Sequence, residues 1–324
     1  MFEPSYQRVA AAIEPMKDRF ELAIVDTDGK ITCDGATLDV DSAQPDWGWP
    51  SGEASFGPGG RNLFVALLKS PNLSWVHTGA AGLDNPIWAQ LVDKGATLTT
   101  GHGQAISIAE YVMGEVISHF QRLPERRAEQ AAHRWTRLPF REIAGMRWLI
   151  VGFGAIGQGV AERAKGFGAE IVGVRRSGGS HPLASRIAAL DQVRDELPEA
   201  DVVVLSTPLN DATRNMADAG FFAAMKPGSV LVNVGRGDLV VEPALLAALE
   251  GGAPDYAILD VFHTEPLPAD SPFWDHPKVA ICPHGSFNGS GQAARNDAIF
   301  LENLHRRLAG EPMIYEADPR DLGR

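Results

Sequence analysis

The chain has 324 residues, about twice the length of a typical single domain, which indicates two folded domains. A hydrophobic content of 44% with 22% charged residues excludes a disordered or fibrous protein. The net charge of -12 argues against a nucleic acid partner, because binding to phosphates requires a basic surface.

Membrane insertion and export are not expected from the sequence. No stretch approaches the roughly 18 consecutive apolar residues of a membrane helix, and the first residues lack the pattern of a signal peptide. The two cysteines, Cys33 and Cys282, are too few for a disulfide framework and fit a reducing compartment. We therefore expect a soluble cytoplasmic protein, in which Cys282 is a small buried hydrophobic residue.

The N-terminal third alternates short apolar runs with turn-rich segments. These runs predict strands at 22–26 and 75–78 and a short helix at 87–94. Segment 44–61 is rich in glycine and proline, contains Trp47 and Trp49, and is expected to be long and irregular. Its tryptophans either form a lid that limits the size of a substrate, or pack on their own domain or on a neighbouring subunit.

A regular alternation of strands and helices begins after a long helix that is predicted at 105–121. Six apolar strands are expected, at 148–151, 171–174, 202–205, 230–233, 257–260 and 279–281. A last helix is expected at 292–308. This alternation predicts the α/β class and a doubly wound parallel sheet of the Rossmann type.

A glycine-rich turn, Gly152-Phe153-Gly154-Ala155-Ile156-Gly157, directly follows the first of these strands and opens a helix. In such a turn the first glycine bends the chain tightly, the second lets a pyrophosphate approach, and the third lets helix and strand pack. The N-terminus of the helix offers free N–H groups and a positive dipole end to the phosphates. Because the turn stands between a strand and a helix, it predicts a dinucleotide-binding site.

The end of the second strand usually carries an acidic residue that binds the ribose hydroxyls of the cofactor. Arg175, Arg176 and Ser177 stand there in this chain. Two guanidinium groups and a hydroxyl suit a 2′-phosphate better than a bare ribose. We therefore expect NADPH as the preferred cofactor, with NAD as the alternative if these arginines are only solvated.

Three residues suited to carbonyl reduction, Arg236, Glu265 and His284, each follow one of the last three strands. Ligands of open α/β sheets bind at the carboxyl ends of the strands, so we expect these residues to share one crevice. An arginine can hold a carboxylate, and a histidine can exchange a proton near neutral pH. A neighbouring glutamate can keep that histidine charged.

With these segments the chain resembles the D-isomer-specific 2-hydroxyacid dehydrogenase family, which includes glyoxylate/hydroxypyruvate reductases, D-lactate dehydrogenases and phosphoglycerate dehydrogenases. The likeness covers nearly the whole chain. Its motifs are WVHTGAAGLD at 75–84, SIAEY at 107–111, the glycine-rich turn, LSTPL at 205–209 and His284-Gly285.

The resemblance implies a role for each candidate site residue. Arg236 would bind the carboxylate and the 2-oxo group of the substrate, His284 would be the acid/base, and Glu265 would be its partner. Backbone N–H groups of Ala81 and Gly82 would hold the substrate carboxylate. Thr207 and Pro208 would line the cofactor, and Asp260 would meet the nicotinamide amide. The full set of expected cofactor contacts is Gly152, Gly154, Ala155, Ile156, Gly157, Arg175, Arg176, Ser177, Thr207, Pro208, Val234, Asp260, His284 and Gly285.

The resemblance also implies the domain organisation and the reaction. Residues 1–103 and 288–324 would form a smaller, flavodoxin-like substrate domain, and the dinucleotide-binding domain, 104–287, would be inserted between them. The expected activity is reduction of small 2-oxo acids of the glyoxylate or hydroxypyruvate type to D-2-hydroxy acids, without a metal, by a homodimer. Arg175 departs from the NAD-using members, which have an acidic residue there. An alternative is a cofactor-sensing binding protein or corepressor with little turnover.

Overall fold

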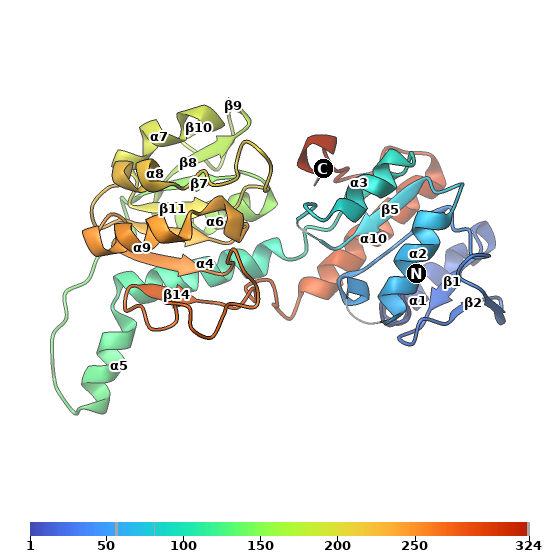
Figure 1. Cartoon of the computed structure of the whole chain (residues 1–324), viewed down its shortest axis with the longest axis horizontal. Coiled ribbons are helices and arrows are strands. Elements are labelled where there is room, and N and C mark those ends of the chain that lie inside the picture. Colours follow the sequence, from blue (N-terminus) through green and yellow to red (C-terminus); the bar gives the residue numbers. More distant parts are fainter. Residues whose placement is uncertain (56–57, 81, 323–324) are drawn as a thin grey trace. The chain divides into compact units, whose positions relative to one another are not determined.

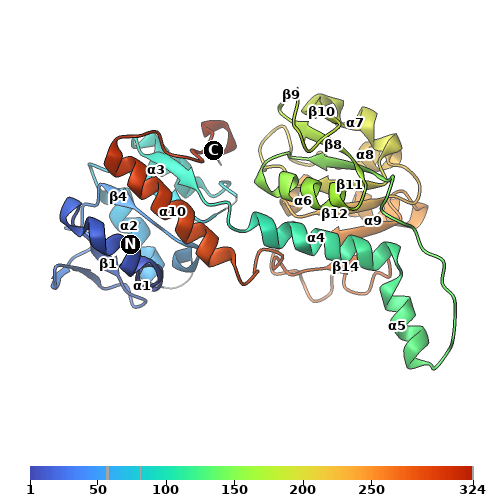
Figure 2. The ribbon, with the colours of Figure 1, turned by 180° about the vertical axis from the view of Figure 1, so that it is seen from behind.

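The computed structural model describes residues 1–55, 58–80 and 82–322, and the chain forms two compact units, seen in Figure 1 and, from behind, in Figure 2. The first unit comprises Met1–Gln104 with Ser290–Arg324, and the second comprises Ala105–Gly289. The boundaries expected from the sequence, 103/104 and 287/288, lie one and two residues from these points. Within the described residues, no helix combines the length and apolar character needed to cross a membrane.

The second unit is built around one eight-stranded sheet. Its strands are β7 (Arg147–Val151), β8 (Glu170–Arg175), β9 (Ser177–Gly179), β10 (Arg186–Ala189), β11 (Val202–Leu205), β12 (Val230–Asn233), β13 (Tyr256–Leu259) and β14 (Val279–Ile281). Its helices are α4 (Ala105–Phe120), α5 (Leu123–Ala131), α6 (Ala155–Gly166), η3 (Leu190–Gln192), α7 (Val193–Glu196), η4 (Leu197–Glu199), α8 (Ala219–Ala224), η5 (Gly237–Leu239) and α9 (Glu242–Gly251).

The strands of this sheet are ordered β14-β13-β12-β11-β7-β8-β10-β9, and all neighbours are parallel except β10 and β9. All six predicted strands are present, which confirms the doubly wound parallel sheet. The strand order reverses between β7 and β11, the place where such sheets bind their ligands. Strand β9, at one edge, and its neighbour β10 are absent from the prediction, because their sequences are short and contain few residues that favour strands.

Alternate residues of the central strands enter two cores, one on each face of the sheet. In β7, Trp148 and Ile150 pack in a core to which α4 and α6 contribute. Leu149 and Val151 pack in a second core, to which α8 and α9 contribute. The strand is therefore buried on both faces, which explains its uninterrupted apolar sequence.

Helix α5 buries none of its residues, and in Figure 1 and Figure 2 it extends away from the sheet of the second unit. The returning loop packs on the helix: Arg126 donates to the Leu138 carbonyl at 2.7 Å and lies 5.4 Å over the Phe140 ring. Trp135, in the same loop, is 97% exposed. We call residues 123–140 the α5 arm.

The first unit contains two three-stranded sheets, antiparallel β1-β2-β3 and parallel β4-β5-β6. Its strands are β1 (Ala23–Val25), β2 (Ile31–Cys33), β3 (Ala36–Leu38), β4 (Trp47–Gly48), β5 (Trp75–Thr78) and β6 (Thr97–Thr100). Its helices are α1 (Glu3–Ile13), η1 (Glu14–Arg19), η2 (Gly52–Ser55), α2 (Pro58–Lys69), α3 (Pro86–Asp93), α10 (Gln292–Ala309) and η6 (Pro319–Asp321). The two strands and two helices predicted for this unit are confirmed, with bounds that differ by one residue at most.

The prediction of a long irregular segment at 44–61 is wrong in part, because β4, η2 and the start of α2 lie within it. The lid hypothesis for its tryptophans is also wrong. Trp49 is 2% exposed and stacks on Phe300 of α10, with ring centroids 3.9 Å apart. Trp47 packs edge-on against Trp75 at 5.9 Å. Both rings belong to the core of their own unit, where aromatic surface is removed from water.

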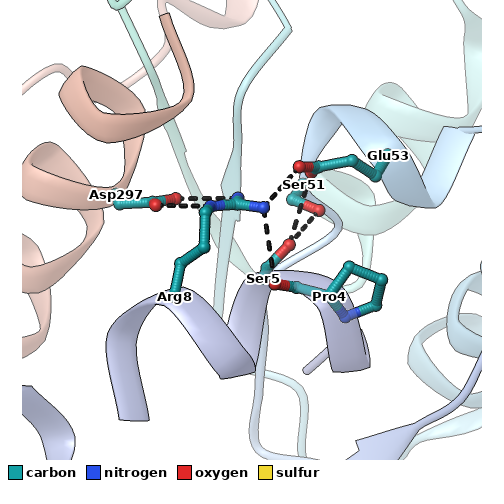
Figure 3. A network of polar contacts seen from close by, with 6 residues as sticks. All are labelled: Pro4, Ser5, Arg8, Ser51, Glu53 and Asp297. Carbon is teal, nitrogen blue, oxygen red and sulfur yellow. Dashed lines mark hydrogen bonds and ion pairs between the residues drawn. The ribbon is translucent and has the colours of Figure 1, made fainter. Parts of the chain in front are cut away.

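A polar network joins three parts of the first unit (Figure 3). Arg8 of α1 donates to Asp297 of α10 at 2.6 Å and to Glu53 of η2 at 2.5 Å. The hydroxyl of Ser5 donates to that of Ser51 at 2.5 Å, and both serines are buried. The C-terminal helix is thus fixed to the N-terminal one by charge-assisted hydrogen bonds.

Replacing Trp49 with alanine is expected to lower the free energy of unfolding by about 3–5 kcal/mol, because it leaves a cavity beside Phe300. Urea denaturation followed by circular dichroism measures this change. Phe167→Ala is the matched control, since the Phe167 side chain is half exposed. A Trp49→Ala protein of unchanged stability but altered substrate range would restore the lid hypothesis.

Candidate active site

The glycine-rich turn between β7 and α6 depends on glycine at two positions. Gly152 has a φ of +95°, and a Cβ there would lie 2.5 Å from the carbonyl carbon of Ser206. A Cβ on Gly157 would lie 2.2 Å from the carbonyl oxygen of Gly152. Both contacts are with backbone atoms that cannot move aside, so only glycine fits. The loops after β7 and β11 therefore touch at the point where the strand order reverses.

The second glycine of the turn, Gly154, borders open space. A Cβ on Gly154 would meet nothing within 4 Å. Helix α6 begins at the next residue, Ala155, and has no side-chain cap at its N-terminus. Ala155 and Ile156 are both half-buried. Open space beside uncapped N–H groups fits the pyrophosphate of a dinucleotide.

Arg175 lies at the carboxyl end of β8, beside this turn. Its Nε donates to the Phe153 carbonyl at 3.3 Å, and its guanidinium lies 5.7 Å over the Phe153 ring. In the described part of the chain it pairs with no carboxylate. Arg176 is exposed, and the side chain of Ser177 lies outside the described residues. A half-exposed cation held near the phosphate turn suits an anionic group of a cofactor.

The loops after β11 and β12 lie next to the turn. Ser206 donates from its hydroxyl to the Gly152 carbonyl at 2.9 Å. Thr207 and Val234 are buried, whereas Pro208 is exposed. These positions are at the carboxyl edge of the sheet, where we expected cofactor contacts, and their contact with a cofactor stays a prediction.

His284 and Glu265, predicted as acid/base and partner, are in contact. The Nδ1 atom of His284 lies 2.7 Å from Oε2 of Glu265. The other oxygen, Oε1, accepts the Phe262 N–H at 2.9 Å. The two side chains remain 43% and 35% exposed, so the pair is open to a ligand. Because Nδ1 faces the carboxylate, Nε2 is the ring atom left for exchange of a proton.

The backbone at His284 adopts a left-handed conformation, with a φ of +47°. Asp260, which is 3% exposed, braces this loop: Oδ1 accepts the N–H groups of Gly285 and Ser286 at 2.9 and 3.0 Å. Its Oδ2 accepts the Ser286 hydroxyl at 2.5 Å, and its carbonyl accepts the His284 N–H at 2.8 Å. Such buried hydrogen bonds hold an uncommon backbone conformation in place. Contact of Asp260 with a nicotinamide amide stays a prediction.

Arg236 stands between β12 and η5. The Asn233 side chain donates to the Arg236 carbonyl at 2.9 Å, and Arg236 Nη1 donates to the Gly235 carbonyl at 2.8 Å. A Cβ on Gly237 would lie 2.0 Å from the Phe262 carbonyl carbon, so this loop packs directly on the one after β13. The three predicted reacting residues thus come from adjacent loops at one edge of the sheet, because β12, β13 and β14 are neighbours.

Comparison with known proteins decides the family. Residues 113–286 match the family model described as "D-isomer specific 2-hydroxyacid dehydrogenase, NAD binding domain". The chain belongs to the D-isomer specific 2-hydroxyacid dehydrogenase family. This confirms the resemblance seen in its motifs and makes the protein a member of a family of oxidoreductases.

Two curated relatives illustrate the range of the 2-hydroxyacid dehydrogenase family. "Glyoxylate/hydroxypyruvate reductase A" of Klebsiella pneumoniae is 34% identical over 264 residues, which are 78% of this chain and 83% of the relative. "D-3-phosphoglycerate dehydrogenase" of Mycobacterium tuberculosis is 32% identical over 248 residues, 76% of this chain and 47% of the relative. The chain thus spans about half the length of the phosphoglycerate dehydrogenases that it matches.

Solved structures of the family cover almost the whole chain. An NADPH-dependent glyoxylate/hydroxypyruvate reductase from Sinorhizobium meliloti, in complex with NADP and sulfate, superimposes with a TM-score of 0.75 at 25% identity, covering 98% of this chain and 96% of that one. A family member from Xanthobacter autotrophicus, in complex with NADPH and MES, gives a TM-score of 0.76 at 26% identity, covering 97% and 95%.

The remaining predicted contacts of a 2-hydroxyacid dehydrogenase lie in the first unit. Gly82 is described and follows β5, whereas Ala81 lies outside the described residues.

The expectation that Cys282 is a small buried hydrophobic residue is wrong, because it is half-exposed. Partial burial and the neighbouring Asp260 carboxylate raise the pKa of the Cys282 thiol to about 11, so the thiol stays protonated near neutral pH.

Sequence reasoning missed two groups of residues around this site. Ser286 and its hydrogen bond to Asp260 have no distinctive sequence signal, since serine is common in loops. The contact between His263 and Asp238 was also missed. Its only signal is position: each residue lies two places from a predicted site residue, Glu265 and Arg236 respectively.

Proposed function

We propose that the protein reduces small 2-oxo acids, of the glyoxylate or hydroxypyruvate type, to D-2-hydroxy acids and prefers NADPH. The observation that carries this proposal is the contact between His284 and Glu265 at the carboxyl edge of the sheet. It supplies a proton-exchanging group at the same edge of the sheet as the turn, where Gly154 leaves room for a dinucleotide.

The cofactor would be held by the edge residues of the second unit, and when bound it supplies the hydride for C2 of the substrate. The glycine-rich turn would hold its pyrophosphate, and Arg175, Arg176 and Ser177 its 2′-phosphate. Thr207 and Pro208 would line the site, and Asp260 would meet the carboxamide. The solved relatives that carry NADPH or NADP support this preference.

The chain's own residues orient the substrate and move its proton. Arg236 binds the carboxylate and the 2-oxo oxygen. We propose the first unit as the substrate domain. Glu265 holds the imidazole of His284 at Nδ1, and Nε2 of His284 passes the proton to the oxygen that forms the new hydroxyl. Fixing the carboxylate presents one face of C2, which gives the D configuration.

The proposal is tested by mixing the purified protein with NADPH or NADH and a panel of 2-oxo acids while following the nicotinamide absorbance. We expect turnover of roughly 1–1000 per second with glyoxylate or hydroxypyruvate, and a lower KM for NADPH than for NADH. Tight NADPH binding without consumption for every acid of the panel would instead favour the cofactor-sensing alternative.

We further propose that the protein is a homodimer joined through the α5 arm. The arm buries no residue on its own chain, and it displays Trp135, which is 97% exposed. An exposed aromatic on a projecting element suits a protein interface.

The glutamate variant of Trp135 is expected to sediment as a monomer, because a charge buried in an interface is strongly unfavourable. Sedimentation velocity at several concentrations measures the change. Trp274→Glu is the control, since Trp274 is 47% exposed in the same unit but outside the arm. A wild-type monomer, or an unchanged Trp135→Glu dimer, would contradict the proposed interface.

A further inference from the structure

A cluster of three polar side chains lies beside the proposed reacting groups and takes no part in the chemistry above. His263, in the loop after β13, contacts Oδ1 of Asp238 in η5 through its Nδ1 atom. Arg214 donates from Nη1 to the other oxygen, Oδ2, at 2.8 Å. One carboxylate therefore joins two cationic or proton-donating groups from separate loops. We call Arg214, Asp238 and His263 the latch.

Hydrogen bonds also hold the backbone at Asp238 and at His263. The carbonyl of Asp238 accepts the Asn215 N–H at 2.8 Å, and the N–H of His263 donates to Glu242 of α9 at 2.8 Å. The close approach of Gly237 to Phe262 places the two loops in backbone contact. The latch side chains thus add polar contacts between two loops, those after β12 and β13, whose backbones already touch.

The position of the latch links the two loops that carry Arg236 and Glu265. Asp238 follows Arg236 by two residues, and His263 precedes Glu265 by two residues. Between them, the Phe262 N–H donates to Glu265, which contacts His284. A shift of either loop would therefore change the distance between the arginine and the imidazole.

We infer that Arg214, Asp238 and His263 are positioning residues, which hold the Arg236 loop against the Glu265 loop and thereby set the affinity for the 2-oxo acid. This inference rests on the proposed function. The guanidinium of Arg236 must be aligned with the substrate carboxylate to form its hydrogen bonds. A small displacement of Arg236 therefore weakens substrate binding.

The latch contributes little to the stability of the fold. The side chain of His263 is 67% exposed and that of Arg214 is 50% exposed, and ion pairs in water add little free energy. Burial acts to raise the pKa of the Asp238 carboxyl, but the hydrogen bonds from Arg214 and His263 outweigh it and leave that pKa below its usual value. Asp238 is thus ionised near neutral pH, and the effect of breaking the latch is expected in KM rather than in melting temperature.

Steady-state kinetics of three variants at His263 test the inference. His263→Ala is expected to raise KM for the 2-oxo acid about tenfold, the effect expected when a displaced Arg236 loses one charge-assisted hydrogen bond to the substrate carboxylate, with kcat lowered less than about threefold. His263→Asn should keep KM near the wild-type value, because its amide can donate from the place of Nδ1. His263→Gln should not rescue, because its amide reaches the place of Nε2. The Kd for NADPH should stay within about twofold in all three.

Further measurements separate positioning from general damage. Asp238→Ala combined with His263→Ala should raise KM no more than Asp238→Ala alone, since loss of the carboxylate already breaks the His263 contact. His276→Ala is a control for the loss of an imidazole elsewhere in the same unit, because His276 pairs with Glu250. The inference is overturned if KM is unchanged in His263→Ala, or if KM rises equally in all three variants. It is also overturned if a lower melting temperature explains the rise in KM.

Amide hydrogen exchange distinguishes failure of the latch from failure of the proposed function. If the wild type neither reduces a 2-oxo acid nor binds oxamate in the presence of NADPH, the proposed function fails. The latch is still tested, because His263→Ala should then speed exchange in residues 236–241 relative to His276→Ala. If residues 236–241 exchange at equal rates in the two variants, the proposed role of the latch is contradicted, whatever the activity.

Discussion

Replacing His284 with asparagine is expected to lower turnover by about a hundred- to ten-thousand-fold, the usual contribution of a positioned acid/base. Asparagine is the sharpest choice for two reasons. It tolerates the left-handed φ of +47° at this position better than alanine does, and its amide can still donate to Glu265 in place of Nδ1. The variant therefore removes the titratable Nε2 and leaves the loop intact.

Stopped-flow or single-turnover kinetics at saturating NADPH measure the chemical step of this variant, and calorimetry measures its cofactor affinity. The affinity for NADPH should fall far less than turnover does, because the pyrophosphate turn is untouched and His284 is only one of the expected cofactor contacts. His276→Asn, which changes a histidine away from the site, should retain wild-type turnover. Near-normal rates in His284→Asn would contradict the assignment of the proton donor.

Replacing Arg175 with glutamine is expected to weaken NADPH binding by about ten- to a hundredfold, since a charge-assisted hydrogen bond contributes about 1.5–3 kcal/mol. Glutamine keeps a donor that can reach the Phe153 carbonyl, which Arg175 now contacts at 3.3 Å. The local packing is then preserved while the positive charge is lost. Binding of NADH should change by less than about twofold, because it carries no 2′-phosphate.

Fluorescence titration of both cofactors against wild type and variant measures this selectivity. Arg194→Gln is a suitable control, because Arg194 pairs with Asp218 and is half exposed elsewhere in the same unit. An unchanged Kd for NADPH in Arg175→Gln would contradict the proposed preference. Equal weakening of NADPH and NADH would show a structural effect on the Phe153 turn instead.

The central part of the fold could be predicted because its strands are buried on both faces. Runs such as Trp148 to Val151 are continuous and apolar, so their positions follow from hydrophobicity alone. The short strands β9 and β10 could not be predicted. Ser177–Gly179 forms β9 only because β10 offers it a partner, and no residue of that run favours a strand by itself.

The site shows the same division between local and distant information. Glu265 and His284 follow neighbouring parallel strands, whose carboxyl ends lie at the same edge of the sheet. This rule therefore predicts that the two side chains lie close together, and they are in contact in the structure. The lid hypothesis failed because the partner of Trp49 is Phe300, which lies about 250 positions further along the chain. Glycine and proline around Trp49 predicted a loop, but no local pattern indicates which distant helix will cover a tryptophan.

The division of the first unit into two segments affects how the chain folds during synthesis. Val9, Ile13, Trp49 and Trp75 share a core with Phe300 and Leu304 of α10. We therefore expect the first segment of this unit to keep part of its apolar surface uncovered until α10 leaves the ribosome. The second unit is one uninterrupted stretch that ends before α10, so we expect it to fold ahead of the segment that precedes it.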